Sequence, residues 1–442
     1  MEKDRQKELQ ETLIGLGPDK KPFPPKHYEE LSLQDTILLH HMAAVFMQNH
    51  AKDDRQKIFF GQRMAFFENQ VITKLWAMRE FYAIIHKGNG NLYVEKNTKT
   101  DDRQIFIFST REGAKNAAEK LSRKNKDLDI KEFAHNQFPP FYLNLFPRGI
   151  TAVILDWGQT PVGLPLWAIC GCLKEEFVLE QSRPAVHLWT SREMYLLYST
   201  VTQMPYAECD SETYDDMVYL YTSKDGADAA VKAFEEKNIP VTAKRFINRQ
   251  FHQTFFNLYL MGVNAVHTEK DGIIQLNMLV PKPDYTKLPE EKRPILNPEL
   301  LLTAVYVCQE ERRPQGEKDT DELKQMKEEL MAHLREGWLA MPVFTKDNPE
   351  NPGQLQFPIV TLTNGERYCP VFTDVESGKE FEKMQKITDE NGNHPEIRYI
   401  KMFFDKILQI LPPQIQGVTI NPNTINLIMK KTQKEEQPQE NN

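Results

Sequence analysis

The sequence lacks the features that mark several large classes of protein. Its five cysteines are an odd number spread through 442 residues, so they do not predict the disulfide framework of a small secreted domain. No apolar run approaches the roughly 20 residues that span a bilayer. The first ten residues mix acids and bases, unlike a secretory signal or a transit peptide. A reducing cytoplasm is therefore the predicted compartment, and no membrane partner is expected.

An excess of positive charge is also missing. The chain has 55 Lys and Arg against 63 Asp and Glu, a formal net charge of −8. A general nucleic-acid binder needs a basic surface to neutralise phosphates, so no nucleic-acid partner is expected. With 40% hydrophobic and 27% charged residues, the composition is that of a globular protein. The length suits about three domains of roughly 100 to 200 residues each.

Signatures of enzymes and metal sites are missing as well. The sequence contains no Gly-x-Ser-x-Gly, His-Glu-x-x-His or Cys/His nucleophile pattern. Cys170 and Cys172 could supply two zinc ligands, but neither a second cysteine pair nor a His-x₃₋₅-His partner follows, so small buried thiols are the preferred interpretation. His40-His41 and His50 could form a cluster, yet adjacent helical positions point about 100° apart. One packed and one exposed histidine is the simpler expectation.

Three further features have a structural interpretation beside the functional one. Gly88–Asn91 lacks the Gly-Lys-Ser/Thr of a phosphate loop and predicts a turn. Asp101-Asp102 and Asp215-Asp216 could bind a divalent cation, although solvated loops explain them better. The aromatic stripes at Phe138-Phe141-Tyr142 and Phe251-Phe255-Phe256 are more typical of a core than of a ligand platform. No catalytic, cofactor-binding or metal residue is assigned, and no cofactor is expected.

The sequence does contain one segment that occurs three times in diverged form. FSTREGAKNAA begins at Phe108, YTSKDGADAAV at Tyr221 and the looser FTDVESGKEF at Phe372. Each leads to a Gly before an apolar strand, after 41, 41 and 45 residues respectively. The first two segments align at a constant shift of 113 with twelve of 42 pairs identical. The chain therefore holds three copies of one domain, and the third has diverged, with a small insertion at 389–393.

Each copy predicts the same order of elements. An anchor strand comes first, followed by a capping box, in which a hydroxyl and an acid three residues later start a helix. A short strand, an aromatic-rich helix, a left-handed glycine cap and a last strand complete the copy. The capping boxes are Ser109/Glu112, Thr222/Asp225 and Thr373/Glu376, and the cap glycines are Gly149, Gly262 and Gly417. The three hydroxyl residues are therefore interpreted as helix starts and not as repeated nucleophiles.

The predicted fold is of the α+β (α/β-like) class, with three tandem ββαβαβ-type repeats whose mixed sheets are covered by helices. We expect a weakly ordered lead-in at 1–31, then helices from Ser32 and over about Asp54–Ile85. Copy three gains a hairpin through an Asn364-Gly365 turn of type I′. The predicted domains are 32–180 (helices and copy one), 181–285 (copy two), a linker at 286–297, 298–431 (helical pair and copy three) and a disordered tail at 432–442.

The third copy resembles the SseB N-terminal domain family. The resemblance is carried by the run Phe357–Gly365, by Tyr368–Thr373 and by Gly417–Pro422, and it covers about Leu339–Met429. It implies a sheet-forming hairpin and a late strand that ends in Asn-Pro, here Asn421-Pro422. Copies one and two have Asp156-Trp157 and Glu269-Lys270 at that place. The resemblance implies no catalytic residues, and a specialised function would be expected where the copies differ.

Three hypotheses about function follow. The preferred one is a non-enzymatic cytoplasmic interaction or scaffold protein that binds a protein or peptide, because duplication raises valency without needing chemistry. The alternative is an enzyme or small-molecule sensor with a site in a cleft between repeats. A third, suggested by the family resemblance, is a role in bacterial secretion or toxin immunity. Self-association is left open by all three.

Overall fold

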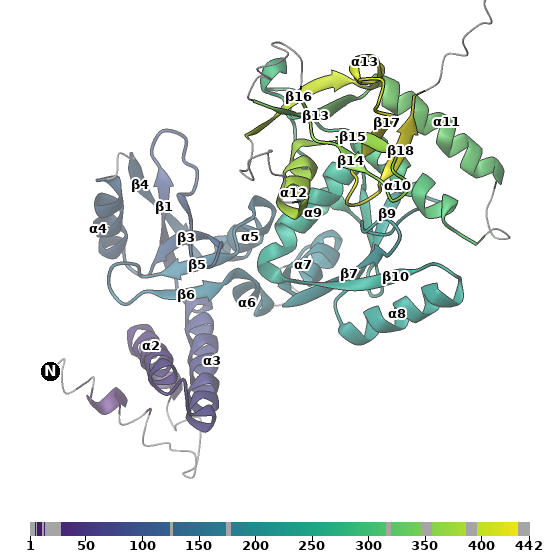
Figure 1. The fold of residues 1–442 in the computed structure, drawn as a ribbon. Coiled ribbons are helices and arrows are strands. Elements are labelled where there is room, and N and C mark those ends of the chain that lie inside the picture. The colour runs from purple at the N-terminus through teal and green to yellow at the C-terminus, as the bar shows by residue number, and fades with distance from the viewer. Residues whose placement is uncertain are drawn as a thin grey trace, which may run out of the picture. The chain divides into compact units, whose positions relative to one another are not determined.

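The computed structural model describes residues 5, 7–10, 13, 28–123, 127–173, 178–314, 320–345, 356–385 and 396–431. They fall into two compact units (Figure 1). The first comprises Met1–Arg192 with Asn248–His252, and the second comprises Glu193–Ile247 with Gln253–Asn442. Copy one lies in the first unit, whereas the second holds most of copy two and all of copy three. The expected tail at 432–442 and the insertion at 389–393 lie outside the described residues.

Two antiparallel helices precede copy one, α2 (Leu33–Asn49) and α3 (Asp54–Trp76). Ser32 begins α2, since its hydroxyl accepts the Asp35 amide at 3.0 Å. The expectation that the second helix continues to Ile85 is wrong: α3 ends at Trp76, and Glu80–His86 is a strand, β1. The apolar residues of β1 pair with strands on both sides, and such a short run cannot be told from a buried helix by periodicity alone.

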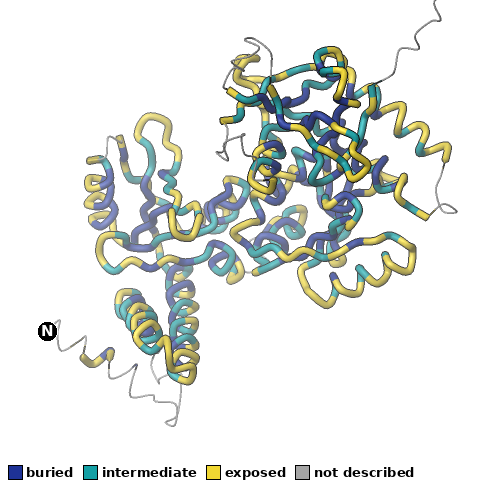
Figure 2. Tube along the Cα trace, viewed as in Figure 1, coloured by how far each residue is buried: buried dark blue, intermediate teal, exposed yellow. Residues whose placement is uncertain are grey.

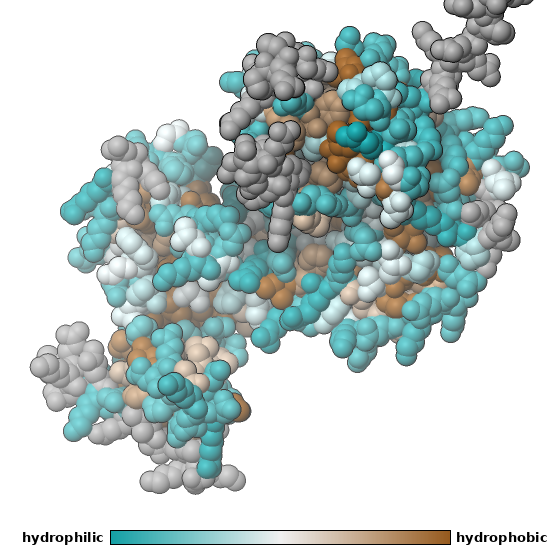
Figure 3. All heavy atoms as spheres, in the orientation of Figure 1, coloured by the Kyte–Doolittle hydropathy of each residue, from teal (hydrophilic) through white to brown (hydrophobic). Residues whose placement is uncertain are grey.

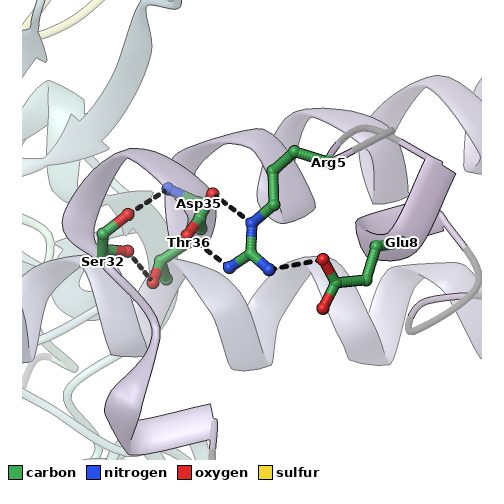
Figure 4. Close-up of polar contacts among 5 residues, drawn as sticks. All are labelled: Arg5, Glu8, Ser32, Asp35 and Thr36. Atoms are coloured by element: carbon green, nitrogen blue, oxygen red, sulfur yellow. Dashed lines mark hydrogen bonds and ion pairs between the residues drawn. The ribbon is translucent and has the colours of Figure 1, made fainter. Parts of the chain in front are cut away.

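Six residues of the N-terminal lead-in before Tyr28 are described. Residues 5, 7–10 and 13 are helical, and Leu9 and Leu13, one turn apart, are 1% exposed in the core of α2 and α3. Figure 4 shows Arg5 between two carboxylates: Nη2 lies 2.8 Å from Asp35 Oδ2, and Nη1 lies 2.7 Å from Glu8 Oε2. The hydrogen bonds from Arg5 hold the pKa of Asp35 below its usual value. An apolar stripe and a charge pair thus hold this segment against α2.

Copy one is a six-stranded sheet in the order β4-β1-β3-β5-β6, with β2 beside β3. Only β3 and β5 are parallel among these pairs. Helix α4 packs its small residues on one face of the sheet, and the aromatic side chains of α5 pack on the other, where the Phe81 and Phe138 rings lie 4.6 Å apart. The elements are β1, β2 (Val94–Lys96), β3 (Arg103–Phe108), α4 (Arg111–Ser122), β4 (Leu128–Ala134), α5 (Phe138–Leu143), β5 (Ala152–Leu155), β6 (Val162–Pro165), α6 (Leu166–Gly171) and α7 (Arg183–Thr190).

Copy two repeats this sheet in the order β10-β7-β9-β11-β12, with β8 beside β9. Its parallel pair has the same register: Val218 faces Val266 as Ile105 faces Val153, each shifted by 113 positions. Helix α8 buries only Ala227 and is largely yellow in Figure 2. The elements are β7 (Glu193–Ser199), β8 (Ala207–Cys209), β9 (Asp216–Tyr221), α8 (Lys224–Glu236), β10 (Val241–Ile247), α9 (Phe251–Met261), β11 (Ala265–Thr268) and β12 (Gly272–Gln275).

Copy three has the same order of elements, but its sheet is divided. The pair β13-β16 joins the four strands β14-β15-β17-β18 through an isolated bridge between Ala340 and Phe372. The elements are α10 (Pro298–Glu311), α11 (Thr320–Glu336), β13 (Trp338–Phe344), β14 (Val360–Thr361), β15 (Arg367–Val371), α12 (Val375–Gln385), β16 (Ile397–Phe403), α13 (Phe404–Ile410), β17 (Gly417–Ile420) and β18 (Leu427–Lys430). The predicted α+β class with mixed sheets and an N-terminal helical part is confirmed.

The helix starts and one glycine differ in detail from expectation. The residues that begin α4, α8 and α12 are Thr110, Ser223 and Asp374, each of which accepts the amide three residues later, so the predicted caps are wrong by one position. Gly149 and Gly262 have the expected positive φ of 70° and 95°. Gly417 instead opens β17.

A Cβ at Gly417 would lie 2.0 Å from the Met429 carbonyl oxygen, so close strand approach is what requires glycine there. The hairpin at Asn364-Gly365 forms, but only Gly365 has positive φ (83°), so the turn is not of type I′. Asn364 instead uses its side-chain oxygen to accept the Glu366 amide at 3.0 Å.

The first unit includes a short segment from the middle of copy two, Asn248–His252. The Asn248 side-chain amide donates to the carbonyls of Trp189 and Ser191, both at 2.8 Å. The His252 ring lies 3.2 Å from the Pro147 carbonyl through Nε2, and a Cβ on Gly149 would come within 2.9 Å of that ring. The first unit is therefore completed by residues that follow the four strands β7, β8, β9 and β10 of the second copy in sequence.

The described surface is mostly polar on the face seen in Figure 3, where hydrophobic residues occur in small groups among hydrophilic ones. Within the described ranges, no helix combines the length and the apolar character that crossing a bilayer requires.

Candidate functional site

The place where the three copies differ lies at the end of each last strand. Asp156 follows β5, Glu269 lies just after β11 and Asn421 follows β17. Asp156 and Asn421 are 2% and 3% exposed and have φ of 52° and 44°, a left-handed conformation that Asp and Asn tolerate better than most residues. The strand end thus points a polar side chain back into the domain.

In copy one, Asp156 is a buried carboxylate that accepts three hydrogen bonds. Its Oδ1 accepts the Ser109 amide at 2.8 Å, and its Oδ2 accepts the Ser109 hydroxyl at 2.8 Å and the Gln34 side-chain amide at 2.9 Å. These bonds satisfy the carboxylate and connect the strand end to α2 and to the start of α4. Ser109 is therefore a structural donor.

Copy three makes the same connection with an amide. Asn421 Oδ1 accepts the Thr373 amide at 3.1 Å, and Asn421 Nδ2 donates to the Thr373 hydroxyl at 2.9 Å. In copy two Glu269 is exposed, and a Cβ added to Gly226, at the start of α8, would lie 2.8 Å from its carboxylate. The strand-end residue therefore fastens the helix start in copies one and three, and we call this contact the strand-end lock.

The boundary between copies two and three is formed by α10. Nine of its 14 residues are buried, and most of these are apolar, so the body of this boundary is a filled hydrophobic seam. A Cβ at Gly262 would lie 2.6 Å from the Pro298 carbonyl oxygen, which shows how closely α10 follows copy two. Cys308 on α10 points its thiol toward the Ile425 carbonyl of copy three, 3.6 Å away.

A cavity of about 310 Å³ lies at the carboxyl end of this helix, within the second unit. Its polar groups are bound to one another and to backbone. Arg312 donates to the Val201 carbonyl of copy two at 2.6 Å and to the Ile425 carbonyl of copy three at 3.1 Å. Gln309 exchanges two hydrogen bonds with the Ala207 backbone, at 3.3 and 2.9 Å. We call this cavity the boundary pocket. The hydrogen bonds of Arg312 and Gln309 that surround it join copies two and three.

Several titratable groups of the boundary pocket either are paired or have a raised pKa. Burial, with the nearby Asp216, raises the pKa of the Cys209 thiol, so a reactive thiolate is disfavoured. The Tyr306 hydroxyl donates to Asp216 at 2.7 Å, and burial raises the pKa of both groups. Arg313 lies 3.2 Å from Glu310. This arrangement can hold a polar ligand, but it does not activate a nucleophile.

The cysteine and histidine candidates do not converge. Cys170 is buried and Cys172 exposed, and burial raises the pKa of both thiols. The His50 ring donates from Nδ1 to the Phe46 carbonyl oxygen, 2.8 Å away, while His40 Nε2 lies 3.9 Å from Glu68. Within the described residues, no group of three or more His, Cys, Asp or Glu side chains could hold a metal ion.

The glycine-rich segment and the acids Asp101, Asp102 and Asp215 lie in loops. Asp216 instead is the first residue of β9 and is half-buried, so the predicted solvated loop is wrong for this residue. Asp102 accepts the Thr151 hydroxyl at 2.9 Å, and Asp215 accepts the Gln275 amide at 2.8 Å, so each pair fastens its loop to a neighbouring strand or turn. Gly88–Asn91 forms the turn that follows β1, with Gly90 at a φ of 67°. The aromatic stripes are core: Phe138, Tyr142, Phe251 and Phe255 are fully buried.

Comparison with known proteins adds little. No family model matches the chain, and no curated protein matches it. Among solved structures, Tic22 from Anabaena, described as a protein of protein transport, is 12% identical over 48% of this chain and 90% of its own, with a TM-score of 0.16. Tic22 from Plasmodium falciparum is 10% identical over 41% of this chain and 88% of its own, with a TM-score of 0.15. Superpositions this poor carry no argument about function.

Proposed function

We propose that this chain is a non-enzymatic cytoplasmic binding protein, whose SseB-like copies form a scaffold for a protein or peptide partner. One observation carries the proposal: polar groups at the boundary of copies two and three are bound to backbone and to one another. Arg312 and Gln309 join strands and turns of different copies, and burial raises the pKa of the nearby Cys209 thiol. An enzyme would need at least one of these groups poised for proton transfer or attack.

The buried seam along α10 supports the same proposal. A helix with nine of 14 residues buried fixes copies two and three in one arrangement. A fixed arrangement lowers the conformational entropy lost when a partner binds both copies at once. The exposed helix α8 belongs to the same unit and offers surface that this seam leaves uncovered.

The test is affinity capture from native lysate with the tagged full chain, followed by cross-linking and mass spectrometry. A partner that binds the folded chain but not heat-unfolded chain, with cross-links to described surface residues of the copies, supports the proposal. Failure to retain any partner reproducibly, together with consumption of a metabolite by the purified chain, would overturn it.

The boundary pocket favours a second candidate, a small-molecule sensor. Its cavity of about 310 Å³ is at the small end of the range for ligand sites, and Arg313 and the edge of β8 line it. Screening polar metabolites by thermal shift against the whole chain tests this candidate. A stabilising compound whose effect disappears in Arg313→Met supports it, and an effect that survives this change contradicts it.

A further inference from the structure

Copy one contains a second cavity, of about 330 Å³, that lies wholly within the first unit. It opens between the end of β1, the outer strand β4 and helix α5. Its floor is apolar and includes Phe133 and Phe141, whose rings lie 4.5 Å apart. Its rim is polar. The described lining is Ile85, Gly90, Asn91, Leu92, Lys131, Phe133, Gln137, Pro140, Phe141, Asn144, Leu145 and Arg148.

The charge of this copy-one pocket has one sign. Lys131 and Arg148 are exposed at its rim, and neither makes an ion pair with another described residue. The described lining contains no carboxylate. The nearest acid on the same face of β4 is Asp129, which accepts the Ile130 amide at 2.8 Å and does not line the cavity. The Lys131 ammonium lies 5.3 Å from the Phe133 ring, so one cation stands directly above the apolar floor.

Copies one and two can be compared residue by residue at this pocket. Five of the twelve residue pairs that are identical between copies one and two belong to the lining: Lys131/Lys244, Phe133/Phe246, Gln137/Gln250, Asn144/Asn257 and Leu145/Leu258. The frame of the pocket is therefore common to both copies, and the differences lie in what fills and charges it.

Copy two fills the same place with side chains. Tyr198 replaces Ile85, and the Lys244 ammonium lies 3.7 Å from the centre of the Tyr198 ring. Met261 replaces Arg148 and is 2% exposed, so the second cation is gone. The Asn257 side chain accepts the Gln253 amide at 2.8 Å, whereas that of Asn144 makes no hydrogen bond with the described part of copy one. Copy two thus provides a comparison within the same chain, in which the protein's own side chains fill the equivalent place.

We propose that the copy-one pocket binds an organic carboxylate with an apolar body, in which Lys131 and Arg148 hold the carboxylate and the aromatic floor holds the body. A guanidinium and an ammonium at the mouth favour an anion, and Arg pairs with carboxylates through two parallel hydrogen bonds. The volume fits a single ring with a short acidic arm. The same chemistry is present in a free aryl acid and in the C-terminal Phe of a peptide.

Titration calorimetry on the full chain at low salt tests the proposal with three probes: phenylacetate, the isosteric neutral phenylacetamide, and N-acetyl-Gly-Gly-Phe with a free carboxylate. We expect phenylacetate to bind about tenfold more tightly than phenylacetamide. Lys131→Gln and Arg148→Met should each weaken phenylacetate about fivefold or more, because each removes one charge partner. Tighter binding of the peptide than of phenylacetate would identify a peptide C-terminus as the source, and the reverse order a free acid.

Lys244→Gln is the matched control, since it removes the equivalent cation of copy two and should leave affinity unchanged. Ile85→Tyr is a second, uncharged test, because it introduces the ring that occupies copy two and should abolish binding. Circular dichroism and thermal unfolding of each variant establish that the fold is retained. Equal affinity for phenylacetate and phenylacetamide, equal loss in Lys244→Gln, or no heat of binding with any probe at millimolar concentration would overturn the proposal.

Discussion

Replacing Asp156 should test whether the strand-end lock holds copy one together. Asp156→Ala removes the acceptor for the Ser109 amide and hydroxyl and for Gln34, which lie 2.8, 2.8 and 2.9 Å from the carboxylate. Leaving the half-buried Ser109 amide without a partner costs about 1–3 kcal/mol, and the lost charge-assisted bonds add to this. Alanine in the left-handed conformation at this site, where φ is 52°, adds about 1–2 kcal/mol. The total is about 4 kcal/mol.

Asp156→Asn should cost much less, because Asn421 makes the equivalent contact in copy three. The amide oxygen can still accept the Ser109 amide, and Asn tolerates positive φ. We expect about 1 kcal/mol for Asp156→Asn and under about 0.5 kcal/mol for Glu269→Ala, whose side chain is exposed.

Scanning calorimetry measures these differences, since 1 kcal/mol corresponds to about 2–4 °C for a unit of this size. Asp156→Ala should therefore lower the unfolding temperature of the first unit by about 10 °C. Hydrogen exchange at the start of α4 should accelerate in the same variant, which assigns the loss to this contact. If Asp156→Ala unfolds within 1 °C of the parent chain, or if Asp156→Asn is as damaging, the lock does not stabilise the domain.

The remaining predictions concern the Arg5–Asp35 ion pair, the Cys209 thiol and the contacts of Arg312 with copies two and three. The Arg5 hydrogen bonds lower the folded-state pKa of Asp35, so the stabilisation by Asp35 is present above the ordinary value of 3.8 and is lost as pH falls through the folded value. The protection of the lead-in amides, measured as hydrogen exchange relative to the intrinsic rate at each pH, should therefore fall below about pH 3.8, and Arg5→Gln should remove this pH dependence. Burial raises the pKa of the Cys209 thiol, so in a Cys172→Ser variant, which removes the other exposed cysteine among the described residues, Cys209 should react with a disulfide reagent at pH 7.5 more slowly than free cysteine; an equal rate would contradict the shift. Arg312→Met should destabilise the second unit by about 1–2 kcal/mol in denaturant unfolding, and an unchanged midpoint would show that its two carbonyl contacts are dispensable.

The repeat in the sequence predicts much of the fold, because duplicated domains must share a sheet. The anchor strands, the aromatic helices and the pair α10 and α11 lie where the pattern places them. The first strand of each copy was not predicted. Phe81–Ile85 is an apolar run with neighbours on both sides, and a run that short has no period that separates a strand from a buried helix.

The candidate sites were harder to predict, since contacts across the fold decide them. The position of Asp156 is visible in the sequence as a difference between copies, but its bond to Ser109, 47 residues away, is not. In copy one the lock uses Ser109, and the next residue, Thr110, caps the helix. Copy two shifts its cap to Ser223 without this contact, so the lock does not account for every shifted cap. The copy-one pocket could have been found from the identical pairs between copies, because Lys131, Phe133 and Asn144 recur together although they come from two separate elements.

The segment Asn248–His252 bears on how the chain is synthesised. The first unit needs these five residues, which bond to Trp189, Ser191 and Pro147. A ribosome must therefore make β7 to β10 before the first unit can be completed, although domains usually fold as they emerge. A fragment that ends at Arg192 leaves the carbonyls of Trp189 and Ser191 without this donor. Completion of the first unit therefore depends on prior synthesis of part of the second unit. Cleavage of one peptide bond does not separate a complete first unit from the rest of the chain.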